Sequence, residues 1–391
     1  MKGAFKTLFI LFVVLSLAVF SGGCGGSSSG DSTSEEVESG GQEAEDGNGT
    51  EASDSFLVTG PSYSIEGNIV RITGGGEYTA SGTLEDGRIV VDASGQNVVL
   101  ILNGVTMSSS DGPAILALSG ASVSVVTAEG TINVLSDGGS NEAYDATIFS
   151  SVPLTMDGTG DLVVVGNYQE GIASDSTLTI QGGNIWIKAA DDGLNTGGDM
   201  FINGGYLYIE AIGDGVDSNA NLSIMGGTLI SLGGMEGGDG GIDIDQGFVF
   251  TLSGGTVIAT GMDIVEPNGS GTQTSMLLSF QSDQSAGTII RIEGPASTLT
   301  YDPARSYRSL FFSSPSLTAG SYSVYSGGTA SGTARDGLYE DGSYSEGILQ
   351  THSGSTEGTF EVVAGTSNAY NNVGADQSGG SSDQPGGPQR P

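Results

Sequence analysis

Acidic residues recur at a fixed spacing in the middle of the chain. Glu170, Asp192 and Asp214 are 22 residues apart, and each is followed by glycine. Asn195 and Asp217 have the same spacing. Calcium prefers carboxylate and carbonyl oxygens as ligands, so turns that bring such residues together would suit this ion. The full set of expected calcium ligands is Glu170, Asp191, Asp192, Asn195, Asp214, Asp217, Asn219, Asp239, Asp243 and Asp245.

Electrostatics gives a physical reason for a cation. Carboxylates on neighbouring strands of a sheet lie about 4.8 Å apart at the backbone. Each such pair repels by about 1 kcal/mol in water and by about 3.5 kcal/mol at an effective dielectric constant of 20. The lack of histidine and cysteine in the acidic segments argues against zinc or copper, and the only histidine, His352, lies far outside them. The alternative is that these residues only form solvated turns.

The elements that position these residues form a repeat. Gly-Gly pairs occur at 182–183, 204–205, 226–227 and 254–255, each between two short segments that alternate apolar and polar residues. Alternation of this kind indicates strands with one buried face. A return of about 22 residues is typical of one coil of a β-solenoid. We therefore expect an all-β, parallel β-helix fold, with extra residues near 233–241 forming a loop; a meander of antiparallel hairpins is the less regular alternative.

The same register predicts a column of apolar side chains on the outside of the coils. Trp186, Tyr208, Ile230 and Ile258 occupy matching outward positions. Lys188 falls in the next outward column, opposite Glu210 in the following coil. Trp186, Lys188 and Tyr208 are therefore candidate carbohydrate contacts, because stacked aromatic rings can hold sugar rings. Exposed apolar strips are more commonly used for packing, so the alternative is that another part of the chain covers this column.

Composition divides the chain into five segments. Residues 24–55 are rich in Ser, Gly, Glu and Asp, and such a segment cannot bury enough apolar surface to fold. After residue 268 the repeat gives way to ordinary strand patterns with more aromatic residues. We expect a signal segment at 1–23, an acidic tether at 24–55, the β-helix at 56–268, a β-rich C-terminal unit packed on it at 269–366, and a loose tail at 367–391.

The N-terminal segment predicts export. Lys2 and Lys6 precede an apolar run at 8–20, which is shorter than the roughly 20 residues of a membrane-spanning helix and typical of a signal sequence. Small residues then lead to Cys24, the only cysteine, at the position where a bacterial lipoprotein is cleaved and acylated. We expect a lipoprotein on the cell envelope or extracellular side; cleavage without acylation is the alternative.

The charge of the chain excludes some partners. Ten Lys and Arg residues stand against 46 Asp and Glu residues, giving a formal net charge of −36. Nucleic acid would be repelled, because its binding depends on neutralising phosphate charge. An anionic membrane surface would also be repelled, so only the N-terminal lipid would attach the protein to a membrane.

Several motifs together resemble one known family. They lie at 76–84, 100–105, 129–133, 190–195 and 213–219. In these segments the chain is similar to the calcium-containing, carbohydrate-binding parallel β-helix proteins of anaerobic bacterial cell surfaces, which bind cellulose and pectic acid. The resemblance covers about 56–363 and implies a right-handed β-helix, Ca²⁺ at the acidic turns and a plant-type polysaccharide as partner.

The fold also resembles that of calcium-dependent pectate lyases. Such a lyase needs calcium to neutralise a uronate and a Lys or Arg side chain to remove a proton. Lys188 is the only basic residue between 130 and 265, and it precedes the acidic pair by three residues. We therefore expect a binding protein rather than an enzyme. A lyase is the first alternative, and a purely structural or adhesive surface protein is the second; a hydrolase using paired carboxylates also stays open.

Overall fold

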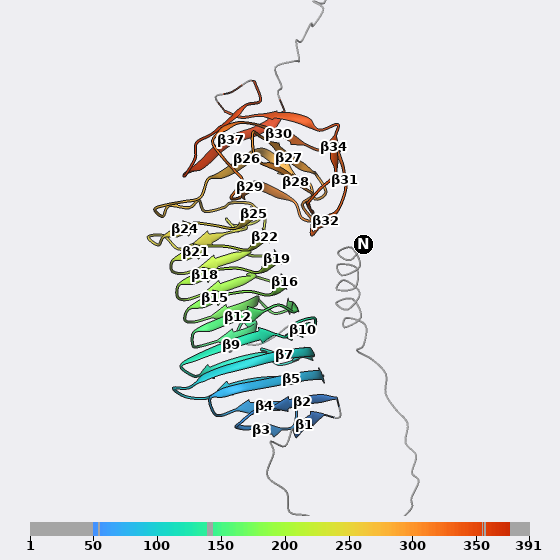
Figure 1. The fold of residues 1–391 in the computed structure, drawn as a ribbon, viewed down its shortest axis with the longest axis vertical. Coiled ribbons are helices and arrows are strands. Elements are labelled where there is room, and N and C mark those ends of the chain that lie inside the picture. Colours follow the sequence, from blue (N-terminus) through green and yellow to red (C-terminus); the bar gives the residue numbers. More distant parts are fainter. Residues whose placement is uncertain (1–49, 54, 139–143, 354, 356, 376–391) are drawn as a thin grey trace, which may run out of the picture.

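The computed structural model describes residues 50–53, 55–138, 144–353, 355 and 357–375. These residues form strands, turns and loops, and no helix is present among them. The strands build an elongated stack of coils with a separate β-rich unit at its C-terminal end (Figure 1). None of the described segments offers a helix of the length and hydropathy needed to span a membrane.

Three parallel ladders of strands run along the stack. The first ladder contains β5 (Gly76–Leu84), β7 (Asn97–Ser108), β9 (Ser122–Thr127), β12 (Leu154–Gly158), β15 (Leu178–Ile180), β18 (Met200–Ile202), β21 (Leu222–Ile224) and β24 (Phe250–Leu252). The second continues from the C-terminal half of β7 through β10 (Ile132–Ser136), β13 (Asp161–Gly166), β16 (Asn184–Ala189), β19 (Tyr206–Ala211), β22 (Thr228–Leu232) and β25 (Thr256–Gly261). The third contains β4 (Ile69–Ile72), β6 (Arg88–Asp92), β8 (Ile115–Ser119), β11 (Ala146–Ser150), β14 (Glu170–Ser174), β17 (Leu194–Thr196), β20 (Val216–Ser218) and β23 (Asp243–Ile244).

This arrangement confirms the predicted parallel β-helix. Leu194 pairs with Val216, and Met200 pairs with Leu222, so the 22-residue return aligns equivalent residues of successive coils. The extra residues of the last repeat form a loop between β22 and β23, as expected. The antiparallel meander is excluded within these ladders, because neighbouring coils pair in parallel.

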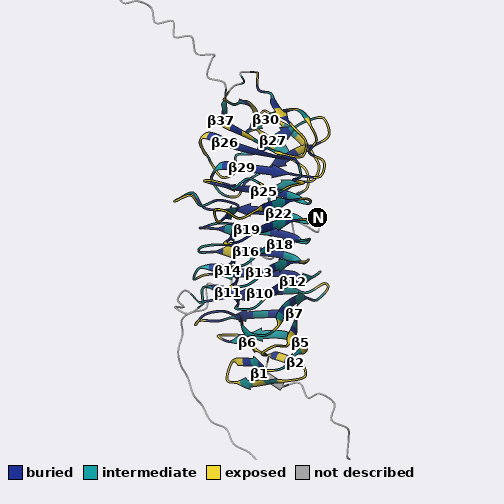
Figure 2. Cartoon of the chain, turned by 90° about the vertical axis from the view of Figure 1, so that its left-hand side faces the viewer, coloured by how far each residue is buried: buried dark blue, intermediate teal, exposed yellow. Residues whose placement is uncertain are grey.

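The core is made of inward side chains stacked along the axis. Leu178, Met200, Leu222 and Phe250 occupy equivalent positions in four coils, and each is fully buried. Figure 2 shows the strands of the coils largely buried, with exposed residues collected at turns and in the loops of the C-terminal unit. Apolar burial of this kind supplies the main driving force for folding.

The Gly-Gly pairs form the turns between the first and second ladders. Gly205 has a φ of +84°, and a Cβ atom built on it would lie 2.8 Å from the carbonyl oxygen of Gly183 in the preceding coil. Gly227 repeats this geometry with a φ of +81°. Glycine is required there both for the backbone conformation and for the close approach of stacked turns.

The C-terminal unit packs on the last coil through β25. Its strands are β26 (Ser275–Gln284), β27 (Ile290–Glu293), β28 (Thr298–Tyr301), β29 (Tyr307–Ser313), β30 (Gly320–Ser326), β31 (Thr329–Ser331), β32 (Ala334–Arg335), β33 (Leu338–Tyr339), β34 (Ser343–Ser345), β35 (Ile348–Thr351), β36 (Phe360–Val362) and β37 (Ser367–Ala375). β29 pairs antiparallel with β25, which places Phe312 opposite Ile258. The predicted β-rich unit is therefore present and joined to the β-helix.

Both predicted ends of the folded region need correction. The tail was expected to begin at 367, but Ser367–Ala375 forms β37, which pairs in parallel with β26. The tether was expected to extend to 55, but β1 (Thr50–Ser53) pairs antiparallel with β2 (Phe56–Thr59). Composition missed these strands because their stability comes from pairing with neighbouring strands and not from an apolar sequence. The signal segment 1–23 and Cys24 lie outside the described residues.

Candidate functional site

The acidic residues meet at the edge between the second and third ladders. The backbone N–H of Gly171 donates to the carbonyl of Asp192 at 2.9 Å, and that of Gly193 donates to Asp214 at 2.9 Å. Glu170, Asp192 and Asp214 therefore stand in consecutive coils as one column, as the spacing predicted. We call these three residues the carboxylate column.

The second predicted column flanks the first. Asn195 pairs in register with Asp217, and Asp217 pairs with Asp243. The amide nitrogen of Asn195 donates to Oδ2 of Asp217 at 2.9 Å and to Oδ2 of Asp192 at 3.1 Å. Asn195 therefore links the two columns.

Other predicted ligands lie at different distances from this edge. Asp191 directly precedes Asp192, and Asp239 lies in the loop between β22 and β23. Asn219 and Asp245 follow β20 and β23, at the opposite end of the third-ladder strands. The structure thus brings most of the set to one edge but separates Asn219 and Asp245 from the carboxylate column.

The column also stabilises the stack of turns directly. Oδ1 of Asp192 accepts a hydrogen bond from the backbone N–H of Asp214 at 2.7 Å. Oδ1 of Asp214 accepts one from the backbone N–H of Gly240 at 2.6 Å. Each aspartate thereby satisfies a backbone donor in the next coil, and hydrogen bonds to charged acceptors are stronger than neutral ones.

Burial and mutual repulsion disfavour the charged forms of these groups. Desolvation and the nearby Asp145 raise the pKa of Glu170 to about 8. Desolvation and neighbouring aspartates raise the pKa of Asp214 to about 7 and that of Asp217 to about 7. None of the ion pairs in the described part of the chain includes these three residues.

The donor chemistry of the column fits a hard cation. Oε2 of Glu170 is buried and has no hydrogen-bond partner, which leaves an oxygen without the compensation that a buried polar atom needs. Across the described residues, however, no three His, Cys, Asp or Glu side chains converge as a ready-made metal site. A calcium ion bound here would therefore draw on backbone carbonyls and water as well as carboxylates.

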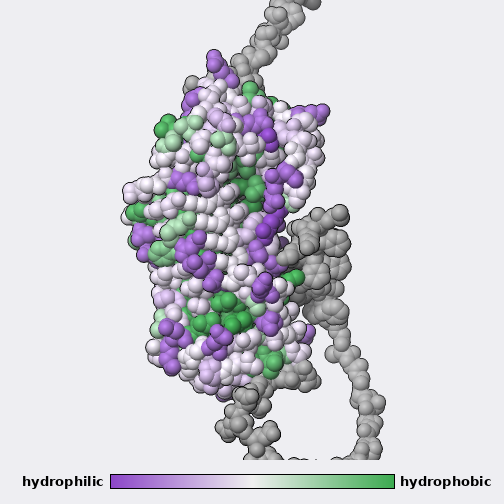
Figure 3. Space-filling model, in the orientation of Figure 1, coloured by the Kyte–Doolittle hydropathy of each residue, from purple (hydrophilic) through white to green (hydrophobic). Residues whose placement is uncertain are grey.

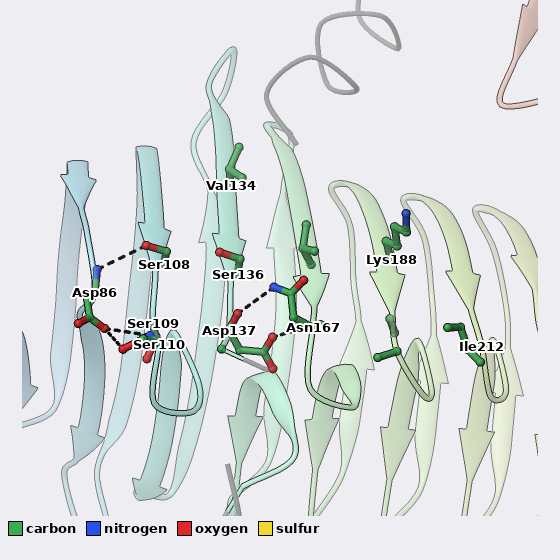
Figure 4. Close-up of a pocket in the computed structure, with 15 residues that line it drawn as sticks. Asp86, Ser108, Ser109, Ser110, Val134, Ser136, Asp137, Asn167, Lys188 and Ile212 are labelled. Atoms are coloured by element: carbon green, nitrogen blue, oxygen red, sulfur yellow. Dashed lines mark hydrogen bonds between the residues drawn. The ribbon is translucent and has the colours of Figure 1, made fainter. Parts of the chain in front are cut away.

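A groove runs beside the column, across successive turns of the stack. It has a volume of about 540 Å³. Asp86, Ser110, Asp137, Asn167, Ala190 and Ile212, each from a successive turn between the second and third ladders, line it in order. Figure 4 labels all of these side chains except that of Ala190 and shows them coming from neighbouring coils. No repeated pattern in the sequence marks this groove, because its lining residues share a position in the coil but no residue type.

Polar groups in the groove are held by the turns themselves. Oδ1 of Asp137 accepts a hydrogen bond from the backbone N–H of Asn167 at 2.5 Å, and the Asn167 side chain donates to the Asp137 carbonyl at 2.8 Å. Burial raises the pKa of Asp137 to about 6. Oδ1 of Asp86 accepts from the backbone N–H of Ser110 at 2.9 Å. Lys188 also lines the groove and is exposed.

The predicted aromatic column exists but is not open. Trp186, Tyr208, Ile230 and Ile258 stand in register along β16, β19, β22 and β25. Trp186 is only 9% exposed, and Ile230 and Ile258 are fully buried against the C-terminal unit. Figure 3 shows separate hydrophobic patches on the face in view and no continuous strip along the coils.

The interpretation of Trp186 and Tyr208 as open sugar contacts is therefore corrected. The alternative, in which the C-terminal unit covers the column, agrees with the structure because apolar side chains of both parts share one cluster. Lys188 lies in register with Glu210, as predicted. Glu210 instead accepts a hydrogen bond from the hydroxyl of Tyr208 at 2.7 Å.

Comparison with known proteins identifies the family. The family model described as carbohydrate-binding domain-containing protein matches residues 66–379. This range includes nearly all of the coils and the C-terminal unit. The chain belongs to this family. Carbohydrate binding is therefore the class of function that the family indicates for this chain.

One sequence relative and one solved structure are similar to this chain. A carbohydrate-binding domain-containing protein of Acetivibrio thermocellus is 37% identical over 134 residues, which is 32% of this chain and 47% of that protein. The chain thus matches about half the length of this relative. A solved structure described as a polysaccharide lyase-like protein from C. thermocellum, gadolinium derivative, has 29% sequence identity and a TM-score of 0.42, and covers 50% of this chain and 86% of that one.

Proposed function

We propose that the protein binds polysaccharide along the edge between the second and third ladders, with calcium held at the carboxylate column. The observation that carries this proposal is the groove beside the column, which takes at least one lining residue from each of six successive turns. A groove of this form suits a linear chain lying parallel to the helix axis. Compact pockets for small molecules are more enclosed.

The lining chemistry supports a ligand rich in hydroxyl groups. Ser108 and Ser136 can each donate and accept, and Asn167 adds an amide. The hydroxyl of Ser110 donates to Asp86 and can still accept. Such groups can exchange hydrogen bonds with sugar hydroxyls without a net charge on the ligand. Turns that are fixed by the hydrogen bonds of Asp86 and Asp137 would present these groups with little loss of conformational entropy on binding.

Calcium would have two roles at this edge. It would offset the desolvation and the repulsion that raise the pKa values of Glu170, Asp214 and Asp217. It could also bridge the column to a carboxylate on the ligand, which favours an acidic, plant-type glycan such as a polyuronate. A divalent ion is needed for such a ligand because the chain has a formal net charge of −36.

The location proposed for this activity is the cell envelope or the extracellular side. Lys2, Lys6, the apolar run 8–20 and Cys24 support export and attachment through an N-terminal lipid. In this arrangement the acidic segment after Cys24 would separate the coils from the membrane.

Calorimetric titration with calcium and then with polygalacturonate tests the proposal. We expect calcium-dependent binding that is lost in Asp192→Asn/Asp214→Asn. The matched control is Asp175→Asn/Asp199→Asn, which makes the same charge change at the corner between the third and first ladders and should bind as the wild type does. Calcium binding without any glycan binding would instead favour a purely structural or adhesive protein.

A lyase is the second candidate, and the position of Lys188 favours it. Lys188 is exposed and lines the groove, and three of the groove's turns carry the carboxylate column. In such a reaction a base removes a proton next to a uronate carboxylate whose charge calcium neutralises. Ultraviolet absorbance of an unsaturated product during the same titration detects it. A rise in absorbance that Lys188→Met abolishes would establish the lyase, and no rise would leave the binding function alone.

A further inference from the structure

One segment of the C-terminal unit reaches across to the coils. This segment, residues 329–345, contains β31 to β34 and is called the arm. Oδ2 of Asp336 accepts hydrogen bonds from Nε1 of Trp186 at 3.0 Å and from the hydroxyl of Tyr206 at 2.7 Å. The Asp336 side chain is only 3% exposed. A single carboxylate oxygen of the arm therefore satisfies the polar groups of both rings.

Arg335 covers the same two rings. Its guanidinium carbon lies 3.3 Å from the centre of the Tyr206 ring and 5.2 Å from that of Trp186. Its Nη2 also donates to Oδ1 of Asn184 at 3.2 Å. Arg335 and Asp336 thus contact the faces of two aromatic rings, the hydrogen-bond donors of those rings and an amide oxygen.

The tip of the arm is built to present these residues. Asp336 and Gly337 link β32 to β33, with φ values of 49° and 82°. Both values are positive, as in the tight two-residue turn that Asp-Gly favours in hairpins. The tip is therefore locally rigid, while β32 and β33 are each only two residues long.

The arm contact differs from the rest of the interface. Farther along the column, Ile230 and Ile258 meet Leu310 and Phe312, and all four are at most 3% exposed. That contact is apolar, so replacing it by contact with water would cost free energy. The arm contact uses a carboxylate and a guanidinium, and the Arg335 side chain is 34% exposed. Water or a hydroxyl-rich ligand can replace its hydrogen bonds.

We propose that Trp186 and Tyr206 form a second sugar-binding site, that the arm occupies this site in the closed state, and that a pyranose chain displaces the arm. A pyranose ring offers an apolar face for the aromatic rings and oxygen acceptors for Nε1 of Trp186 and the hydroxyl of Tyr206. In their place the arm supplies the guanidinium of Arg335 over the rings and the carboxylate of Asp336 as the acceptor. The proposal rests on the carbohydrate-binding function but places this site on the second ladder, away from the carboxylate column.

Trp186 is the only tryptophan in the chain, so its fluorescence reports this site alone. The test compares acrylamide quenching in the full-length wild type, in Arg335→Ala/Asp336→Asn, and in Arg308→Ala/Asp283→Asn. The last variant removes another Arg–Asp pair of the C-terminal unit, whose charged atoms are 2.6 Å apart. Asn is chosen at 336 because it tolerates a positive φ. The probe is a soluble, neutral β-glucan oligosaccharide.

We expect quenching to increase only in the arm variant, and the oligosaccharide to reverse that increase. Its affinity should rise by roughly tenfold over the wild type, because a closed arm reduces the competent fraction. Unchanged quenching in the arm variant would show that the arm is not what shields Trp186 and would overturn the proposal. Increased quenching that the oligosaccharide does not reverse would also overturn it, since the arm would then be only a packing contact.

A measurement on the wild type covers the case in which the arm variant does not fold. Saturating oligosaccharide should change Trp186 emission in the presence of chelator, and an unchanged spectrum would reject the site. Calcium-dependent binding of polygalacturonate is measured separately and reports the carboxylate column. The two proposals can therefore fail independently.

Discussion

The carboxylate column and the aromatic column are made by the same repeat but have opposite surroundings. Each takes one residue from successive coils. Glu170, Asp192 and Asp214 lie at an edge beside an open groove. Trp186, Ile230 and Ile258 lie under the C-terminal unit, at 9% exposure or less. One repeat therefore produces a polar edge and a covered apolar face within the same coils.

The difference shows that register alone does not decide what a column does. The coils align like residues, because each strand pairs in parallel with its equivalent in the next coil. Aligned carboxylates repel one another, and their oxygen atoms stay available to bind a ligand. Aligned apolar residues gain free energy when another surface removes them from water. The C-terminal unit supplies that surface on only one side of the coils.

The largest loss of stability is expected when an acidic residue, the type that forms the carboxylate column, is placed in the covered apolar column. Ile230→Asp buries an unpaired carboxylate and should cost about 4 kcal/mol or more of the free energy of unfolding. Urea unfolding measures the loss. Ser223→Asp is the control, because it adds the same charge to the same coil at a half-buried position on the first ladder. Equal losses in the two variants would contradict a covered column.

Calcium should stabilise the polar edge by a smaller amount. At a free concentration 100 times its dissociation constant, an ion that binds only the folded state adds about 2.7 kcal/mol. We expect chelator to lower the melting temperature of the wild type, and Asp192→Asn/Asp214→Asn to be insensitive to calcium. Scanning calorimetry with and without calcium measures both. A variant that keeps the full calcium response would place the ion elsewhere.

Asp137, which lines the groove, should make the stability of the protein depend on pH. The pKa of Asp137 is about 6 in the folded chain, against an ordinary value of 3.8. Because the folded pKa is the higher one, this group stabilises the fold below about pH 4 and that contribution is lost as the pH rises through about 6. The loss should be on the order of 3 kcal/mol.

Asp137→Asn isolates this contribution. Its amide oxygen can still accept from the backbone N–H of Asn167, so the variant should lose less stability than the wild type between pH 4 and pH 7. Chemical denaturation at several pH values in chelator gives the comparison. Parallel curves for the two proteins would show that Asp137 does not titrate in this range.

The smallest expected effect comes from Lys188, which shares a strand with the covered Trp186 but is exposed. Lys188→Ala should change the free energy of unfolding by less than about 0.5 kcal/mol, as exposed substitutions usually do. Urea unfolding provides the measurement. A loss as large as that of Trp186→Ala, for which about 3 kcal/mol is expected, would mean that Lys188 packs in the interface.

Much of the fold follows from the sequence because its signals are local and periodic. The Gly-Gly pairs predicted turns, and Gly205 and Gly227 do take the positive φ values that such turns need. The 22-residue return placed Glu170, Asp192 and Asp214 in one column, since parallel pairing keeps equivalent residues aligned. The boundaries failed at β1 and β37, whose sequences carry no apolar pattern that distinguishes them from a linker.

The sequence by itself thus determined the coils, their register and the columns that they carry. Only the tertiary structure decided which columns stay accessible. Trp186 meets Asp336, 150 residues later in the chain, and Asn184 meets Arg335 across 151 residues. No local pattern encodes contacts of that separation. The groove likewise arises from the shape of six successive turns, because a concave surface depends on how neighbouring turns protrude and not on the residue type at any one position.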